Sequence, residues 1–82
     1  MIGRWNYITR EYDPYEIPDN WNVKLYSLDM DEIINCTSCG KEVTYGECYT
    51  SFELHNDVGL GYPVCQECYD EEIKRKIKYK DY

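Results

Sequence analysis

Hydrophobic and polar positions alternate most clearly between residues 21 and 27. Trp21, Val23 and Leu25 occupy every second position there, so they would share one face of an extended segment. This spacing predicts a half-buried β-strand. A weaker alternation over residues 4–9 indicates a second strand nearer the N-terminus.

The middle of the chain predicts a short helix followed by a β-hairpin. Asp29 is a suitable N-cap and Glu32 lies three residues later, which favours one or two helical turns. Segments 42–45 and 48–54 then flank Gly46-Glu47, a pattern typical of a hairpin. One face of its second strand would carry Cys48, Thr50, Phe52 and Leu54.

The strongest helix signal follows the last pair of cysteines. Tyr69, Ile73 and Ile77 are spaced at i, i+4 and i+8 and would form one apolar stripe. Acidic residues occupy the first turns and basic residues the later ones, an order that complements the helix dipole. Acid-before-base pairs such as Glu71 with Arg75 would add further support.

The chain has the length of one domain, and we expect a single domain over 1–82. Its charge is unevenly distributed. The 16 acidic and 9 basic residues give a formal net charge of −7. Residues 1–73 hold 15 acids and 4 bases, whereas residues 74–82 hold 5 bases and 1 acid. The acidic body repels phosphates and attracts basic protein surfaces. We therefore expect a protein partner with a basic surface rather than direct nucleic-acid binding.

No membrane association is expected. No apolar run reaches the roughly 18 residues of a membrane helix, and no apolar stretch typical of a secretory signal is present. The chain contains no alanine and is rich in Ile, Lys, Asn and Tyr, a bias typical of AT-rich genomes. These features favour a cytoplasmic location in a bacterial host cell.

Two CxxC pairs form the strongest chemical signal in the chain. Cys36, Cys39, Cys65 and Cys68 follow the spacing C-x2-C-x25-C-x2-C. Four thiolates in two such pairs match one tetrahedral Zn²⁺ of a structural site, and iron is the main alternative in the same cage. Disulfides are disfavoured by the odd cysteine count, and a thioredoxin-type pair by the absence of a βαβ unit.

Two further residues are weaker metal-ligand candidates. Cys48 is expected to be a small buried apolar residue on the inward face of its strand. His55, the only histidine, would lie on the opposite face. No nucleophile–histidine pairing or buried carboxylate pair is evident, and four sulfurs would close the metal's coordination sphere. We therefore expect no enzymatic activity.

The segment from Cys36 to the C-terminal helix resembles treble-clef zinc fingers. That family has a CxxCG knuckle, a β-hairpin and a second CxxC at the start of a helix. Residues 36–41 and 62–68 look like the N-terminal zinc domain of the bacterial Clp AAA+ unfoldase. The resemblance implies a small α+β domain. A zinc-binding treble-clef-like module would span 36–80 and contain the β-hairpin and the C-terminal helix. An aromatic N-terminal β extension over 1–35 would precede it. The resemblance also gives the four paired cysteines the ligand roles.

A looser resemblance concerns size, charge and format. A small acidic zinc protein from an AT-rich genome is similar to phage-encoded anti-CRISPR inhibitors, which bind CRISPR nucleases. It implies an inhibitor that interferes with nucleic-acid loading of a type II RNA-guided nuclease. Two alternatives remain: a zinc-finger adaptor in bacterial transcription or proteolysis, and a nucleic-acid-binding zinc finger acting through the basic C-terminal helix. Expected partner contacts are Tyr12, Asp13, Tyr15, Glu16, Asp19, Asp29, Asp31 and Glu32.

Overall fold

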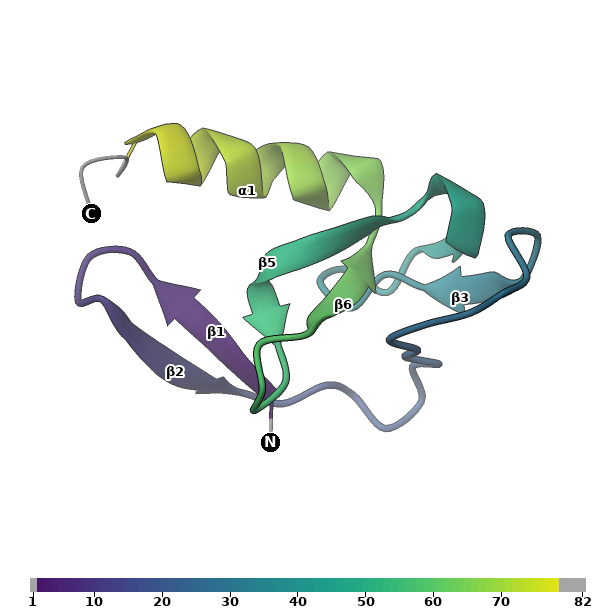
Figure 1. Cartoon of the computed structure of the whole chain (residues 1–82), viewed down its shortest axis with the longest axis horizontal. Helices are drawn as coiled ribbons and strands as arrows, with labels where there is room; N and C mark the ends of the chain where they lie inside the picture. The colour runs from purple at the N-terminus through teal and green to yellow at the C-terminus, as the bar shows by residue number, and fades with distance from the viewer. Residues whose placement is uncertain (1, 79–82) are drawn as a thin grey trace.

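Antiparallel strands form two sheets within residues 2–78, the part of the chain that the computed structural model describes. One sheet has four strands in the order β2-β1-β5-β6, and the other pairs β3 with β4. A C-terminal helix lies alongside β5 (Figure 1). The elements are β1 (Ile2–Asn6), β2 (Glu11–Tyr15), β3 (Ile33–Asn35), β4 (Glu42–Thr44), the 3₁₀ turn η1 (Tyr45–Glu47), β5 (Tyr49–His55), β6 (Gly61–Val64) and α1 (Gln66–Lys78). This arrangement confirms the predicted small α+β architecture.

The N-terminal extension is a hairpin that joins the sheet of the cysteine-bearing segment. β1 pairs with β2 over its whole length and with β5 at Gly3–His55 and Arg4–Leu54. The turn between β1 and β2 is built on Asn6, whose side-chain oxygen accepts hydrogen bonds from the N–H groups of Ile8 and Thr9. Residues 2–15 are therefore part of the sheet that carries β5 and β6.

The predicted hairpin between residues 42–45 and 48–54 is wrong. β4 pairs with β3 instead, while β5 pairs with β6 and β1. The η1 turn separates the two strands, because the N–H groups of Tyr45 and Gly46 bond to the carbonyls of Glu32 and Met30. These bonds hold the turn against the preceding loop and direct β5 into the other sheet.

The strand predicted over residues 21–27 is also absent from the structure. Its backbone forms isolated hydrogen bonds, such as Trp21 N–H to the Pro18 carbonyl, rather than a ladder. The predicted helix at Asp29 is a turn. Asp29 caps the N–H of Asp31 at 2.9 Å, but the Glu32 carboxylate binds Lys24 and Ser27 instead of reaching back to Asp29.

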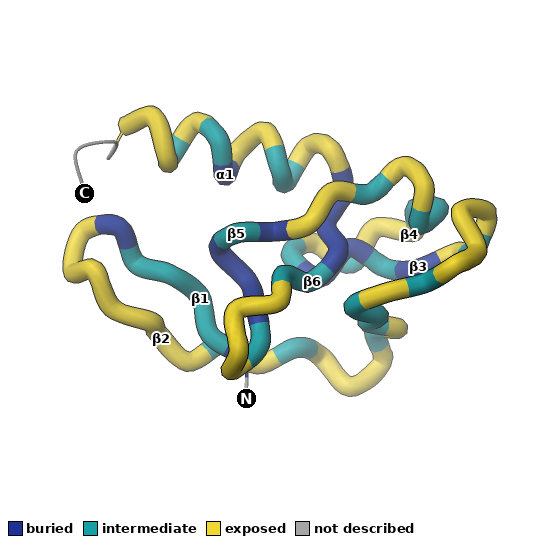
Figure 2. Tube along the Cα trace, in the orientation of Figure 1, coloured by how far each residue is buried: buried dark blue, intermediate teal, exposed yellow. Residues whose placement is uncertain are grey.

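The core is small and includes two of the metal-ligand candidates. Its buried cluster comprises Ile2, Cys36, Leu54, Val64 and Cys65. Figure 2 shows buried positions gathered where β5, β6 and the start of α1 meet, while β2 is exposed. Such a cluster buries little apolar surface for a chain of this length, so a metal held by its cysteines would add stability that the core alone does not supply.

The helix was predicted in the right place, but its buried face differs from the expected stripe. Ile77 is exposed, whereas Glu72 is almost completely buried. The Glu72 carboxylate accepts hydrogen bonds from the Ser51 hydroxyl at 2.7 Å and from the N–H of Phe52 at 3.1 Å. The face of α1 that packs on β5 therefore includes the polar contacts of Glu72 and does not extend to Ile77. Lys80, included in the predicted module, lies outside the described residues.

Candidate metal centre

The first cysteine pair lies in a tight turn between β3 and β4. The N–H of Cys36 bonds to the Lys41 carbonyl at 2.8 Å, and the N–H of Gly40 bonds to the Cys36 carbonyl at 2.7 Å. The N–H of Cys39 points to the Cys36 sulfur at 3.4 Å. Gly40 has a φ of +81°, a conformation that glycine adopts without steric cost. This turn directs both sulfurs to one point.

The second pair is positioned by the junction of β6 and α1. Cys65 immediately precedes the helix and its carbonyl accepts the N–H of Tyr69 at 2.9 Å, while Cys68 lies in the first turn. The N–H of Thr37 bonds to the Pro63 carbonyl at 3.0 Å and so ties the first turn to β6. The fold thereby brings together two cysteine pairs that are 25 residues apart in the sequence.

The four sulfurs fit a single structural zinc ion. Their ligand atoms all lie within 4.8 Å of one another, and the Cys39 and Cys65 sulfurs are 3.8 Å apart. Tetrahedral zinc with sulfur at about 2.3 Å requires sulfur–sulfur edges of about 3.8 Å. The site therefore has the donor set and size that zinc needs, as the sequence predicted. Four protein ligands leave no open position for water, which is typical of a structural site.

Local hydrogen bonds prepare one of the four thiols for ionisation. Burial disfavours the thiolate of Cys36, but the N–H groups of Cys65, Cys39 and Ser38 outweigh burial and lower its pKa. For Cys39 and Cys68, burial raises the pKa. A divalent cation bound by the cluster would stabilise the thiolate forms of Cys39 and Cys68, since metal binding displaces thiol protons.

The two weaker ligand candidates lie outside the cluster. Cys48 precedes β5 and is only half-buried, and its thiol donates a hydrogen bond to the Tyr45 carbonyl at 3.0 Å. His55 is buried at the other end of β5, where its ring packs edge-on against Tyr12 with 4.6 Å between ring centroids. The metal-ligand group found among residues 2–78 contains neither side chain.

Comparison of the chain with protein-family models, curated proteins and solved structures finds no significant match. The treble-clef resemblance therefore depends on this chain's own residues. Within residues 2–78, no helix has both the length and the apolar character needed to cross a bilayer.

The eight expected partner contacts fall into two separate groups. The first lies on β2 and just after it, and the second lies in the turn before β3. Figure 1 shows the second segment at one end of the molecule beside β3, whereas β2 extends toward the other end. The first group consists of Tyr12, Asp13, Tyr15, Glu16 and Asp19, and the second of Asp29, Asp31 and Glu32.

Some of these contacts also have partners within the chain. The Tyr15 hydroxyl bonds to the Thr37 carbonyl at 3.2 Å, and Asp13 accepts the Asn6 side-chain amide at 3.0 Å. Glu32 pairs with Lys24. In contrast, none of the salt bridges among residues 2–78 involves Asp29 or Asp31.

Exposed apolar side chains lie beside Asp29 and Asp31 and were not predicted from the sequence. We define the segment 26–33 as the apical loop. Four of its side chains are largely exposed: Tyr26, Leu28, Met30 and Ile33. The signal was present as an alternation of apolar and acidic residues over 28–31. The same residues also fit a helix start, and a helix would not place these apolar positions together on an exposed loop.

Proposed function

We propose that this chain is a non-enzymatic, zinc-stabilised module that binds a bacterial cytoplasmic protein through its apical loop. Zinc fixes the fold, and the loop supplies the contacts. The partner surface has an apolar depression surrounded by basic side chains, as nucleic-acid-processing proteins present at their binding grooves. The main support for this proposal is that large apolar side chains are exposed on a loop whose conformation is fixed by hydrogen bonds.

The apical loop exposes several large apolar side chains close together in the sequence. Leu28 is fully exposed at 104%, Tyr26 at 69% and Met30 at 59%. Grouped apolar residues with a polar surround are characteristic of interaction sites, and aromatic and methionine side chains are enriched there. Leu28 and Met30 are therefore the anchor residues of the proposed interface.

Hydrogen bonds hold the loop in place from both ends. The Ser27 hydroxyl donates to Glu32 at 2.6 Å, and the Tyr45 hydroxyl donates to the Leu25 carbonyl at 3.1 Å. The N–H of Gly46 bonds to the Met30 carbonyl at 2.9 Å. A loop that is ordered before binding loses little conformational entropy on association, so its exposed side chains contribute more fully to affinity.

Charge supports a basic partner. Asp29 and Asp31 are exposed and alternate with the two anchors, and the chain as a whole carries a net charge of −7. Opposite charge on the partner would speed association and fix the orientation of docking.

The basic helix supports the nucleic-acid alternative less well than its sequence suggested. Arg75 pairs with Glu53, Lys74 pairs with Glu71, and the Lys76 ammonium lies 5.2 Å from the centre of the Phe52 ring. These three cations have partners within the chain, whereas phosphate binding needs a broad basic footprint.

The most specific form of the proposal is a phage-encoded anti-CRISPR inhibitor that blocks nucleic-acid loading of a type II RNA-guided nuclease. Its support is the chain's size, its acidity and its zinc-stapled format. A zinc-finger adaptor in transcription or proteolysis would use the same loop with another partner.

The test compares two variants of the zinc-loaded chain. Leu28→Ser with Met30→Ser removes both anchors, whereas Val58→Ser removes another exposed apolar residue in the β5–β6 turn. We expect a bacterial protein to be retained by the wild type and by Val58→Ser, but not by the anchor variant. Equal retention by all three would refute the proposal. Adding the chain to a type II nuclease before or after its guide RNA tests the inhibitor form, which predicts loss of cleavage only in the first order.

A further inference from the structure

The four clustered sulfurs differ in how easily a molecule in solution can reach them. Cys39 is exposed, whereas Cys36 and Cys65 are buried and Cys68 is half-buried. The Cys36 sulfur also accepts a hydrogen bond from the N–H of Cys39 at 3.4 Å. Oxidants modify accessible thiolates before buried ones. Cys39 is therefore the ligand that an oxidant reaches first.

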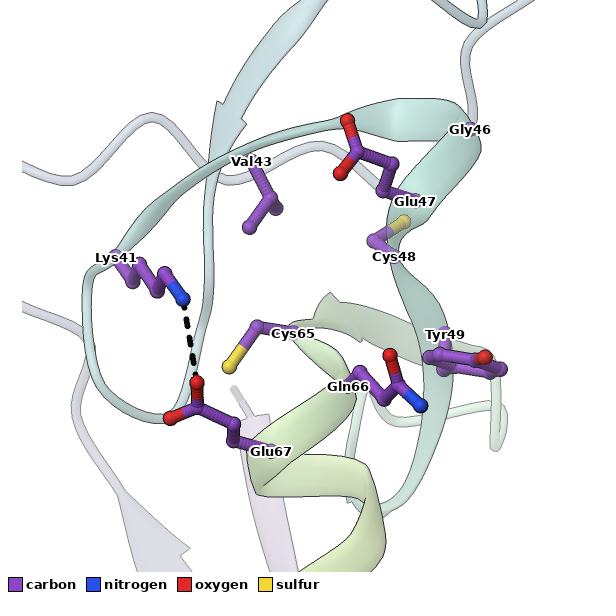
Figure 3. A pocket seen from close by; sticks show the side chains of 9 residues that line it. All are labelled: Lys41, Val43, Gly46, Glu47, Cys48, Tyr49, Cys65, Gln66 and Glu67. Atoms are coloured by element: carbon purple, nitrogen blue, oxygen red, sulfur yellow. Dashed lines mark hydrogen bonds and ion pairs between the residues drawn. The ribbon is translucent and has the colours of Figure 1, made fainter.

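Cys65 is well placed to react with an oxidised Cys39. The two sulfurs are 3.8 Å apart, and a disulfide requires about 2.0 Å, so a side chain has to move. A cavity of about 430 Å³ borders Cys65 between η1 and the start of α1. Figure 3 shows the Cys65 sulfur facing the space between Lys41 and Glu67. This free space lets the Cys65 side chain change its rotamer without displacing neighbouring atoms.

The fifth cysteine borders the same cavity but is not oriented for this reaction. Figure 3 shows the Cys48 sulfur pointing away from the Cys65 sulfur. The Cys48 thiol donates its hydrogen bond to the Tyr45 carbonyl at 3.0 Å. Cys48 is therefore a natural control, a thiol at the same cavity that should stay reduced.

We propose that hydrogen peroxide exchanges the metal of this centre for a disulfide between Cys39 and Cys65. The Cys39 thiolate attacks the peroxide, so that an S–O bond forms, the O–O bond breaks and hydroxide leaves. The Cys65 thiolate then attacks the resulting sulfenic acid, so that the S–S bond forms, the S–O bond breaks and a second hydroxide leaves. The two thiolates lose two electrons, which reduce the peroxide. Cys36 and Cys68 remain and are too few to close a tetrahedral site, so zinc is released.

The disulfide joins the same two parts of the fold that the metal joins. Cys39 lies in the turn between β3 and β4, and Cys65 lies at the junction of β6 and α1. A disulfide within either CxxC pair would leave these parts unconnected. A cross-link across 25 intervening residues also restricts the unfolded chain, so the oxidised chain stays folded without metal. This redox response goes beyond the proposed function because it concerns the scaffold and not the partner.

The test treats the zinc-loaded full chain with hydrogen peroxide, alkylates the remaining thiols and maps the products by mass spectrometry. Trypsin separates residues 25–41, which contain Cys36 and Cys39, from residues 42–74, which contain the other three cysteines. The proposed bond therefore links two peptides, and fragmentation assigns the cysteines within each. We expect one disulfide between Cys39 and Cys65 and one zinc ion released per chain, with Cys48 alkylated. Cys48→Ser should react in the same way.

Circular dichroism distinguishes this exchange from simple metal loss. The oxidised chain should keep its spectrum and melt at a lower temperature than the zinc-loaded chain, whereas the reduced chain after chelation should lose its spectrum. A disulfide within one CxxC pair, any other pairing, or an oxidised chain as unfolded as the chelated one would each overturn the proposal. Retention of zinc at a peroxide dose that fully oxidises an unstructured cysteine peptide would do so as well.

Discussion

Arg75 donates two hydrogen bonds of 2.6 Å to the carboxylate of Glu53, one from Nε and one from Nη. Glu53 is 2% exposed, and Arg4 makes a third, longer contact with it at 3.3 Å. The three side chains come from α1, β5 and β1. A buried acid thus links the helix to the sheet and to the N-terminal hairpin through contacts that involve none of the four clustered cysteines.

Removing Arg75 should destabilise the fold because it leaves the buried Glu53 carboxylate with one long contact. We expect Arg75→Ala to lower the free energy of unfolding by about 2 kcal/mol, less than for a fully buried pair because the guanidinium is partly exposed. Urea denaturation of the zinc-loaded protein measures this. Lys74→Ala is the control, since its exposed pair with Glu71 should contribute less than about 0.5 kcal/mol. Equal losses of unfolding free energy in Arg75→Ala and Lys74→Ala would show that the buried pair with Glu53 stabilises the fold no more than an exposed pair does.

Alanine substitutions at two glycines can distinguish the cost of backbone strain from the cost of a steric clash in the turn that carries Cys36 and Cys39. Gly40 and Gly59 have similar positive φ values of +81° and +85°. A Cβ on Gly40 would lie 2.8 Å from the Trp21 ring, whereas one on Gly59 would meet nothing within 4 Å. Gly59→Ala should therefore cost about 1 kcal/mol of unfolding free energy, and Gly40→Ala about 1–3 kcal/mol more. Gly40→Ala should also weaken zinc binding in a chelator competition. Equal costs would mean that Trp21 moves aside freely.

The sequence predicted the metal centre and α1 well because both depend on local signals. The CxxC spacing brings two sulfurs together within one turn, and the acid-to-base order along α1 matches the helix dipole. Pairing of the cysteine pairs across 25 residues followed from zinc chemistry rather than from any fold prediction. Local rules of this kind do not require knowledge of distant contacts.

Strand pairing was less predictable because distant residues decide it. The alternation at 21–27 is real, but Trp21 packs against Gly40 rather than against a neighbouring strand. Gly46 marks a turn, yet its bond to Met30 sends β5 away from β4. Likewise Glu72 occupies the buried face of α1 because Ser51 and Phe52 of β5 provide its hydrogen bonds. None of these partners is adjacent in the sequence.

Metal analysis of cysteine variants tests the ligand set. The wild-type chain should contain one zinc and no iron, and serine at Cys36, Cys39, Cys65 or Cys68 should abolish stable binding. Structural zinc contributes an apparent free energy of about 10–16 kcal/mol in small zinc-finger domains, which is comparable to the whole stability of a domain. Circular dichroism of these variants, and of the wild type after chelation, should therefore report unfolding. Cys48→Ser should retain zinc, because its thiol only donates to Tyr45. Zinc loss in Cys48→Ser would show that the ligand set is wrong.

Glu72 should make the free energy of unfolding decrease as pH rises, and a variant without the carboxyl group can isolate this effect. Burial, with a contribution from the nearby charge of Glu53, raises the pKa of Glu72 above 4.5, its ordinary value. The folded state then holds the proton more tightly than the unfolded chain does. This contribution to stability is fully present below pH 4.5 and is lost as pH rises through the folded-state pKa.

Glu72→Gln removes the titration, so the free energy of unfolding of this variant relative to wild type should increase with pH across that window. A constant offset is also expected, since the Ser51 oxygen already accepts the N–H groups of Glu53 and Leu54 and cannot readily accept a new amide. Glu71→Gln, on the exposed side of the same turn, should follow the wild-type pH profile. Denaturation at saturating zinc over several pH values measures all three proteins. A Glu72→Gln profile parallel to wild type would show that the buried carboxylate titrates normally.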